Sequence, residues 1–506
     1  MRKYLAALLL AICICEQDIY AADDATVNTV REWRERHEQG IVDEFVELLR
    51  LPNVASDPDG IQLNAEHAAS LLRGAGMQAQ LLRLEGANPV VFAERSQSGA
   101  KHTIMIYIHY DGQPVNPADW ASDPWRPVLR DAPVELGGKT LELKAPFDPE
   151  SRLFARSAAD DKAPIIALKA ALNALDDAGL PLSVNLKVYL DGEEEAGSPG
   201  LRSMLEHYKD LLDSDLWLFC DGPMHQSRRR HLVYGVRGTV GLNMTIHGAN
   251  RPLHSGHYGN WAPNPVMRLA ELLTSMRDPR GKVLIEGFHD EVRPVSEQER
   301  SAVKASPLMD EQLLEELGLG ESESPERLEM AILRPALNVR GIHSGGVGGD
   351  SRNAIQPTAT ASVGLRLVPD QTPEHLRRVV ERHIMAQGYH IVRDQPSPSE
   401  LKAHDRIVQI NWSASGGYPA YRASFDDPMA KRIIEILDPM EEQGLILTPT
   451  MGGSLPIFVI EEVLNTPILI LPIANHDNNQ HGANENLRLQ NLWDGIETYA
   501  ALLTRF

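Results

Sequence analysis

Histidine and carboxylate side chains cluster at five places along the chain, and four of these clusters directly follow a predicted buried strand. These four are His109-Tyr110-Asp111, Glu193-Glu194-Glu195, Asp221 and the segment 476–481, whereas Asp160-Asp161 precedes a predicted helix. Ligands of open α/β sheets bind at the carboxyl ends of the strands, where loops bring distant residues together. We therefore expect the five clusters to form one site.

The residue types in these clusters indicate a metal site. Carboxylates that gather at one point repel one another, so an acidic site of this kind needs cations. Histidine and carboxylate ligands without cysteine suit borderline divalent metals such as zinc. Each cluster alone is more typical of a surface loop, a helix start or a solvated face. The prediction therefore depends on their common placement.

The segments around the clusters alternate between strand and helix. Buried strands are predicted at 103–108, 185–190, 216–220 and 467–472, and helices at 27–51, 163–175 and 198–212. This alternation predicts an α/β fold, in which a mainly parallel sheet carries helices on both faces.

The middle of the chain has a different pattern. Segments 239–247 and 359–368 alternate like strands with one solvated face, and an acidic, helix-rich stretch over 290–330 lies between them. An amphipathic helix is predicted over 373–386. We therefore expect an inserted α+β domain at 237–412, and a catalytic domain formed by 23–236 together with 413–506.

Residues 1–22 have the pattern of a signal peptide. Arg2 and Lys3 precede a short apolar run, and Ala21 or Ala22 supplies the small residue at the cleavage site. The run is too short for a stable membrane anchor. We expect a mature chain that is secreted or periplasmic and has no membrane anchor. The formal charge of −21 argues against nucleic acid as a partner, because nucleic-acid binding needs a basic surface.

Five short motifs occur between residues 109 and 456. They are His109-Tyr110-Asp111-Gly112-Gln113-Pro114, Ala159-Asp160-Asp161-Lys162, Glu194-Glu195-Ala196-Gly197-Ser198, Leu253-His254-Ser255-Gly256 and Gly452-Gly453-Ser454-Leu455-Pro456. In order and approximate spacing they resemble the M20 metallopeptidases, in particular the dipeptidase branch related to carnosine dipeptidases. This resemblance implies a zinc-peptidase-like catalytic domain and an inserted dimerisation or lid domain.

The same resemblance implies two Zn²⁺ ions per chain, with Mn²⁺ or Co²⁺ as alternatives. Their ligands would be His109 and Asp221 on one ion, Glu195 and His481 on the other, and Asp160 between both. His476 is a nearby alternative to His481. We prefer His481, because the segment that follows it, Asn484-Glu485-Asn486-Leu487, resembles the corresponding segment of the family.

The remaining implied roles concern catalysis and substrate binding. Asp111 would orient the His109 imidazole, as carboxylates do behind metal-bound histidines, and Glu194 would be the general base. His254 would stabilise the oxyanion, in this family usually in the site of the partner subunit of a homodimer. Arg366 would pair with the terminal carboxylate of the substrate, and His254, Gly453 and Ser454 would also bind the substrate.

The predicted activity is hydrolysis of the amide bond in dipeptides or short peptides with a free C-terminal carboxylate. Hydrolysis of N-acyl amino acids is the alternative, because the same catalytic residues serve both reactions in this family. A non-catalytic peptide-binding protein on the same fold is a third hypothesis. Glu194 argues against it, since a binding protein has no need of a base beside its metal ligands.

Overall fold

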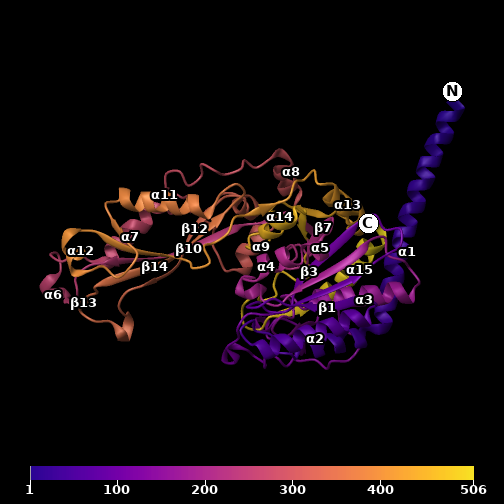
Figure 1. Cartoon of the computed structure of the whole chain (residues 1–506), viewed down its shortest axis with the longest axis horizontal. Helices are drawn as coiled ribbons and strands as arrows, with labels where there is room; N and C mark the ends of the chain where they lie inside the picture. The colour runs from indigo at the N-terminus through magenta and orange to yellow at the C-terminus, as the bar shows by residue number, and fades with distance from the viewer. Residues whose placement is uncertain (1) are drawn as a thin grey trace. The chain divides into compact units, whose positions relative to one another are not determined.

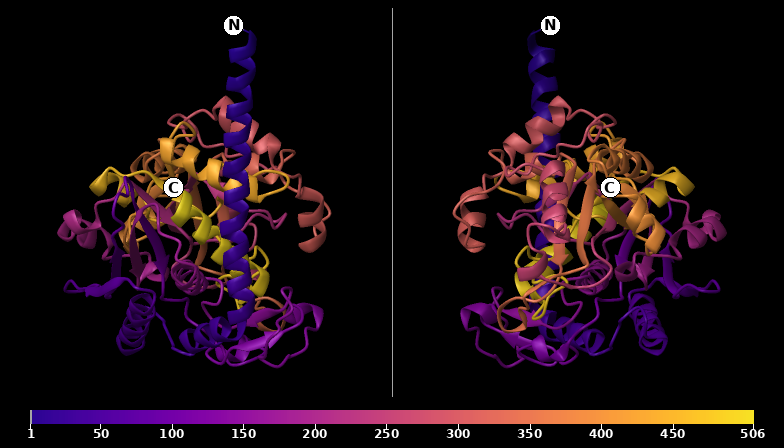
Figure 2. Two further views of the ribbon diagram at one scale, coloured as in Figure 1. Left: turned by 90° about the vertical axis from the view of Figure 1, so that its right-hand side faces the viewer. Right: turned by 90° about the vertical axis from the view of Figure 1, so that its left-hand side faces the viewer.

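The computed structural model describes the backbone of residues 2–506 and the side chains from Ala25 onward (Figure 1). Its first helix, α1 (Arg2–Leu49), is continuous, and Figure 2 shows it as one long helix. The predicted signal peptide at 1–22 lies outside the residues with described side chains, so its cleavage stays a prediction. Within the described residues, no helix has both the length and the apolar character needed to cross a membrane.

The chain forms two compact units. The first unit comprises Met1–Tyr234, Ala423–Leu447 and Val459–Phe506, and the second comprises Gly235–Arg422 and Thr448–Phe458. The second unit therefore contains more of the chain than the insertion expected at 237–412. A short antiparallel pairing of β9 (Gly235–Val236) with β17 (Tyr421–Arg422) extends the unit at both ends of the insertion. The segment Thr448–Phe458 also belongs to it.

The first unit is built on an eight-stranded sheet in the order β1-β2-β6-β3-β7-β19-β8-β18. The strands, in this order, are Gln78–Leu82, Val90–Arg95, Asn185–Asp191, Thr103–His109, Leu216–Phe219, Ile468–Ile470, His231–Val233 and Ile446–Thr448. The four central strands, β6, β3, β7 and β19, are parallel. The pairs β1–β2, β2–β6 and β19–β8 are antiparallel, so the parallel character belongs to the centre of the sheet.

The two faces of the central strands differ. Ile104, Ile106 and Ile108 of β3 belong to a core formed with α1, α2 (Pro58–Gly74), α3 (Ala163–Asp177) and α15 (Leu489–Arg505). On the alternate positions, Tyr107 stacks on Phe219 with ring centroids 3.9 Å apart. Burial on both faces explains why β7 and β19 are apolar along their whole length.

One predicted helix is wrong at its start. The segment 198–212 contains α4 (Leu201–His207) and α5 (Lys209–Leu212), so no helix begins at Ser198. Ser198 has a φ of 44°, which is outside the right-handed helical region. Its hydroxyl donates to Asp191 Oδ2 at 2.8 Å and so does not cap the helix.

The second unit contains a five-stranded sheet in the order β12-β14-β10-β16-β15. The strands are Ala336–His343, Thr358–Leu367, Gly238–His247, Ile407–Trp412 and His390–Val392, and only β15–β16 is parallel. Buried and half-buried residues alternate along β14, as the sequence pattern predicts. Helices α7 (Pro265–Met276) and α11 (Pro373–Ala386) contribute apolar residues to the core of this unit.

Candidate metal centre

Three neighbouring parallel strands of the first unit carry acidic or histidine residues at their carboxyl ends. His109 is the last residue of β3, Asp191 is the last residue of β6, and Asp221 follows β7 by two residues. Because β3 pairs in parallel with both β6 and β7, these ends lie at one edge of the sheet. This is the edge at which the sequence predicts a site.

Two groups of three side chains at this edge have the geometry of metal ligands. They are His109, Asp160 and Asp221, and Asp160, Glu195 and His481, with all ligand atoms of a group within 4.8 Å of one another. His109 Nε2 lies 2.9 Å from Asp160 Oδ1, and His481 Nε2 lies 3.3 Å from Asp160 Oδ2. Asp160 is thus shared by both groups, and His476 belongs to neither.

The electrostatics of these residues fit divalent cations. Asp160 Oδ2 is buried and accepts no hydrogen bond of good geometry. Burial and the negative charge of Asp160 raise the pKa of Glu195 to about 8. Burial and the negative charge of Asp160 raise the pKa of Asp221 to about 6, although the nearby His109 opposes this shift. A bound cation would remove this repulsion, so the residues suit a metal site.

Asp111 contacts both the candidate ligand His109 and the turn that carries Glu194 and Glu195. His109 Nδ1 is 3.2 Å from the Asp111 carbonyl oxygen and 3.4 Å from its Oδ1. The two carboxylate oxygens of Asp111 also accept hydrogen bonds from the backbone N–H groups of Glu194 and Glu195, each at 3.0 Å. One buried carboxylate therefore orients both the His109 ring and the turn that carries Glu194 and Glu195.

Glu194 lies beside the ligands and belongs to neither group. It begins a short 3₁₀ turn, η3 (Glu194–Ala196), that follows β6 after Gly192 and Glu193. Burial and the negative charges of Asp221 and Glu195, opposed by His109, raise the pKa of Glu194 well above its usual value. The structure thus places an unshared carboxyl group next to the candidate ligands.

Glu485 is a buried residue of this centre to which sequence reasoning assigns no role. Its Oε1 accepts hydrogen bonds from the backbone N–H groups of Ala159 and Asp160 at 2.9 Å each. Its Oε2 accepts from Arg156 Nη1 at 2.7 Å and from the backbone N–H of Ser157 at 2.9 Å. Glu485 therefore fixes the loop that presents the shared ligand.

Three residues of the recognised motifs have structural functions around the ligands. Lys162 Nζ is buried and donates to the carbonyl oxygens of Leu48 and Leu51, and burial lowers its pKa to about 7. Gln113 Nε2 donates to Glu195 Oε2 at 2.7 Å. A Cβ atom at Gly112 would lie 2.3 Å from Ser157 Oγ, so glycine permits the close approach of two ligand-bearing loops.

The other predicted site residues, His254, Arg366, Gly453 and Ser454, all belong to the second unit. Arg366 Nη1 donates to Ser454 Oγ at 2.5 Å, and the Gly453 carbonyl accepts from the backbone N–H of Arg237 at 3.0 Å. His254 is exposed at the end of β11 (Leu253–His254), where its Nδ1 accepts from the backbone N–H of Gly256. Of these four, the structure brings Arg366 and Ser454 into direct contact.

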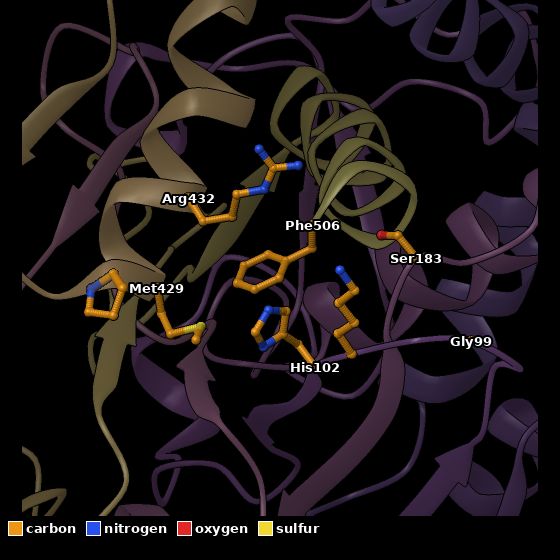
Figure 3. A pocket seen from close by; sticks show the side chains of 8 residues that line it. Gly99, His102, Ser183, Met429, Arg432 and Phe506 are labelled. Carbon is orange, nitrogen blue, oxygen red and sulfur yellow. The ribbon is translucent and has the colours of Figure 1, made fainter.

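A separate hollow of about 490 Å³ in the first unit is lined by Gly99, His102, Ser183, Arg432, Phe506 and three neighbouring residues (Figure 3). None of the candidate metal ligands lines it. The chemistry predicted from the sequence therefore does not belong to this hollow.

The fold and the ligand groups define a metal-dependent hydrolase of the α/β type. Residues 105–505 match the family model described as Peptidase family M20/M25/M40, and the chain belongs to this family. It is therefore a metallopeptidase, as the sequence motifs predict.

Relatives and solved structures agree with this assignment. A Cys-Gly metallodipeptidase of Schizosaccharomyces pombe is 27% identical over 81% of this chain and 81% of its own. A human Beta-Ala-His dipeptidase is 26% identical over 98% and 97% of the two chains. The crystal structure of an M20 family metallo-carboxypeptidase from Sulfolobus solfataricus has a TM-score of 0.74 at 26% identity, covering 92% of this chain and 98% of that one. The predicted family and fold class are confirmed.

Proposed function

We propose that the protein hydrolyses the amide bond of dipeptides or short peptides with a free C-terminal carboxylate, at a centre of two Zn²⁺ ions. The observation that carries this proposal is the pair of ligand groups that share Asp160. The names of the relatives, two dipeptidases and a metallo-carboxypeptidase, support a peptide substrate of this size.

In the proposed reaction, bound zinc supplies Lewis-acid polarisation of the scissile carbonyl and lowers the pKa of a water. Glu194 accepts the proton of the attacking water and later donates it to the departing amine. His254 stabilises the negative charge that develops on the carbonyl oxygen. Arg366, oriented by Ser454, binds the terminal carboxylate of the substrate through charge-assisted hydrogen bonds.

A substrate comparison tests this proposal. The purified protein, loaded with zinc, is assayed for kcat/KM against a panel of dipeptides and a panel of N-acetyl amino acids. We expect the dipeptides to be the better substrates. A preference for N-acetyl amino acids would establish the alternative reaction, and binding without hydrolysis of either panel would establish the non-catalytic hypothesis.

We further propose that the enzyme acts as a homodimer through its second unit, with His254 serving the site of the partner subunit. Exposed apolar side chains in this unit support an interface, since Trp261, Ile342 and Val347 are 80%, 60% and 88% exposed. The variants Glu194→Gln and His254→Ala, each inactive alone, should rescue each other when their subunits are mixed. A mixed dimer has one intact site of two, so each mixed dimer should recover up to about half of the activity of a native dimer.

Two outcomes would contradict the dimer proposal. One is a fully active monomer, as measured by light scattering at the assay concentration. The other is failure of rescue when subunit exchange has been demonstrated by a tagged chain. Either result would leave the peptidase proposal itself intact, because the hydrolytic site is tested separately by the substrate panels.

We also propose that the mature enzyme is exported, on the basis of the N-terminal sequence pattern. Amino-terminal sequencing of the protein recovered outside the cytoplasm should begin directly after Ala21 or Ala22. An intact terminus on the active protein in the cytoplasm would contradict export.

A further inference from the structure

The second unit contains a cavity of about 840 Å³. It is lined by Arg237, by residues between Arg277 and Val295, and by residues between Glu323 and Asn338. This volume falls within the roughly 300–1,000 Å³ that small-molecule sites occupy. No residue of the metal centre lines this cavity, and the function proposed above does not use it.

Positive charge dominates the wall of the cavity, although the whole chain has a formal charge of −21. The lining contains six cationic side chains, those of Arg237, Arg277, Arg280, Lys282, Arg293 and Arg334, and three carboxylates, those of Asp278, Glu323 and Glu326. A basic cavity in an acidic protein attracts anions, because low-dielectric walls concentrate the field of their charges.

The three carboxylates of the wall are already engaged. Glu323 pairs with Arg277, and Glu326 pairs with Arg334 at 2.5 Å. Asp278 Oδ1 accepts hydrogen bonds from the backbone N–H groups two and four residues further along, at 2.9 Å each. Arg293, a further cation of the wall, lies 3.9 Å from Asp370 Oδ2. The carboxylates of the wall and Asp370 therefore account for three of the six cations.

Arg280, Lys282 and Arg237 are the cations of the wall that have no carboxylate partner among the described residues. The side chains of Arg280 and Lys282 are exposed and make no hydrogen bond or ion pair among the described residues. Arg237 donates to the carbonyl oxygens of Gly452 and Arg334 and to no carboxylate. Burial and the positive charge of Arg366 lower the pKa of Arg237 to about 10, as expected where cations face one another.

The cavity adjoins the residues proposed to bind the terminal carboxylate of the substrate. Ala336, which lines the cavity, pairs with Arg366 across β12 and β14. The backbone N–H of Arg237 donates to the Gly453 carbonyl, and the next residue, Ser454, accepts from Arg366. Arg237 thus belongs to the basic wall and also contacts the Gly452–Gly453 segment that precedes Ser454.

We propose that this cavity binds the side-chain carboxylate of the C-terminal residue of the substrate, so that the enzyme prefers peptides ending in glutamate or aspartate. The inference rests on the proposed function, in which Arg366 binds the main-chain carboxylate of that same residue. Arg237, with Arg280 and Lys282 as further cations of the wall, supplies the charge that the second carboxylate requires. Charge-assisted hydrogen bonds to arginine and lysine are the interactions that carboxylates form most strongly.

The test compares two dipeptides that differ in charge and hardly in size, Ala-Glu and Ala-Gln. For the zinc-loaded enzyme we expect kcat/KM for Ala-Glu to exceed that for Ala-Gln about five-fold or more, the upper range of a partly exposed ion pair. In the double variant Arg280→Gln, Lys282→Gln this ratio should fall toward one. The matched double variant Arg382→Gln, Lys402→Gln removes two exposed charges from the same unit, outside the cavity, and should keep the native ratio.

Equal cleavage of both dipeptides by the native enzyme would overturn the inference, as would a ratio that the Arg280, Lys282 variant leaves unchanged. If neither dipeptide is cleaved, the substrate panels decide the proposed function, and calorimetric titration with L-glutamate and L-glutamine decides the inference separately. Tighter binding of L-glutamate that is lost in the Arg280, Lys282 variant would support the cavity as a carboxylate site. Equal binding of the two amino acids would overturn it.

Discussion

The ligand cluster of the first unit and the cavity of the second unit are opposite in charge and differ in how that charge is held. In the first unit, buried carboxylates surround His109 and are fixed by main-chain hydrogen bonds from neighbouring loops. In the cavity wall of the second unit, six cations exceed three carboxylates, and the side chains of Arg280 and Lys282 make no hydrogen bond or ion pair among the described residues. A rigid acidic site suits small cations that require defined geometry, whereas long cationic side chains at an open wall suit ligands of varied shape.

Replacing Asp160, the ligand that both groups share, should have the largest effect, because it should remove the metal site of the first unit. We expect the native enzyme to contain two divalent ions per chain and the variant Asp160→Ala to lose both metal and hydrolytic activity, because Asp160 belongs to both ligand groups. Atomic emission spectrometry and a dipeptide assay measure the two quantities. Asp210→Ala, an exposed aspartate outside both groups, is the control. One ion or none in active native enzyme would show that the site is not dinuclear.

Replacement of the unshared carboxylate should separate chemistry from metal binding. Glu194→Gln should keep the native metal content while kcat falls about 10²- to 10⁴-fold, the usual contribution of a general base. Glu195 is the next residue and belongs to the second ligand group, so Glu195→Gln should instead reduce the metal content. If Glu194→Gln lost metal to the same degree as Asp160→Ala, Glu194 would be a ligand.

Removing the positive charge of Arg366 in the second unit should weaken substrate binding and leave the metal content unchanged. Arg366→Gln should lower kcat/KM for a dipeptide about 10- to 100-fold, because a hydrogen bond to a charged group contributes about 1.5–3 kcal/mol. The loss should be small for the C-terminal amide of the same dipeptide, which lacks the carboxylate. An equal loss for both substrates would assign Arg366 a structural role in its contact with Ser454.

The smallest effect is expected for Glu485, which contacts the loop of the shared ligand and is not itself a ligand. Glu485→Gln replaces one acceptor oxygen by an amide group facing N–H donors, which should loosen the Ala159–Asp160 loop. We expect metal affinity to fall about 10-fold, as measured by competition with a chelator. Glu85→Gln, an exposed glutamate of the same unit, should keep native affinity. Unchanged affinity in the Glu485 variant would mean that the loop is held by its other contacts.

The edge of the sheet that carries the candidate ligands can be predicted from the sequence. Apolar runs identify the buried strands, and the histidine and carboxylate clusters follow the ends of these strands. The sequence does not reveal Glu485, whose partners are main-chain N–H groups more than 300 residues earlier in the chain. The start of α4 is mispredicted because the left-handed conformation of Ser198 leaves no mark in composition. The basic cavity is equally hidden, since its residues come from three separate segments of an acidic chain.

The shared hydrogen bonding of Asp111 has a consequence for how substitutions combine during evolution. Because one carboxylate orients both the His109 ring and the turn bearing Glu194, a change at Asp111 alters a ligand and the base together. Residues coupled in this way show non-additive effects when they are changed in combination. Divergence toward new substrates is therefore easier in the second unit, where the cations of the cavity wall can be exchanged one at a time.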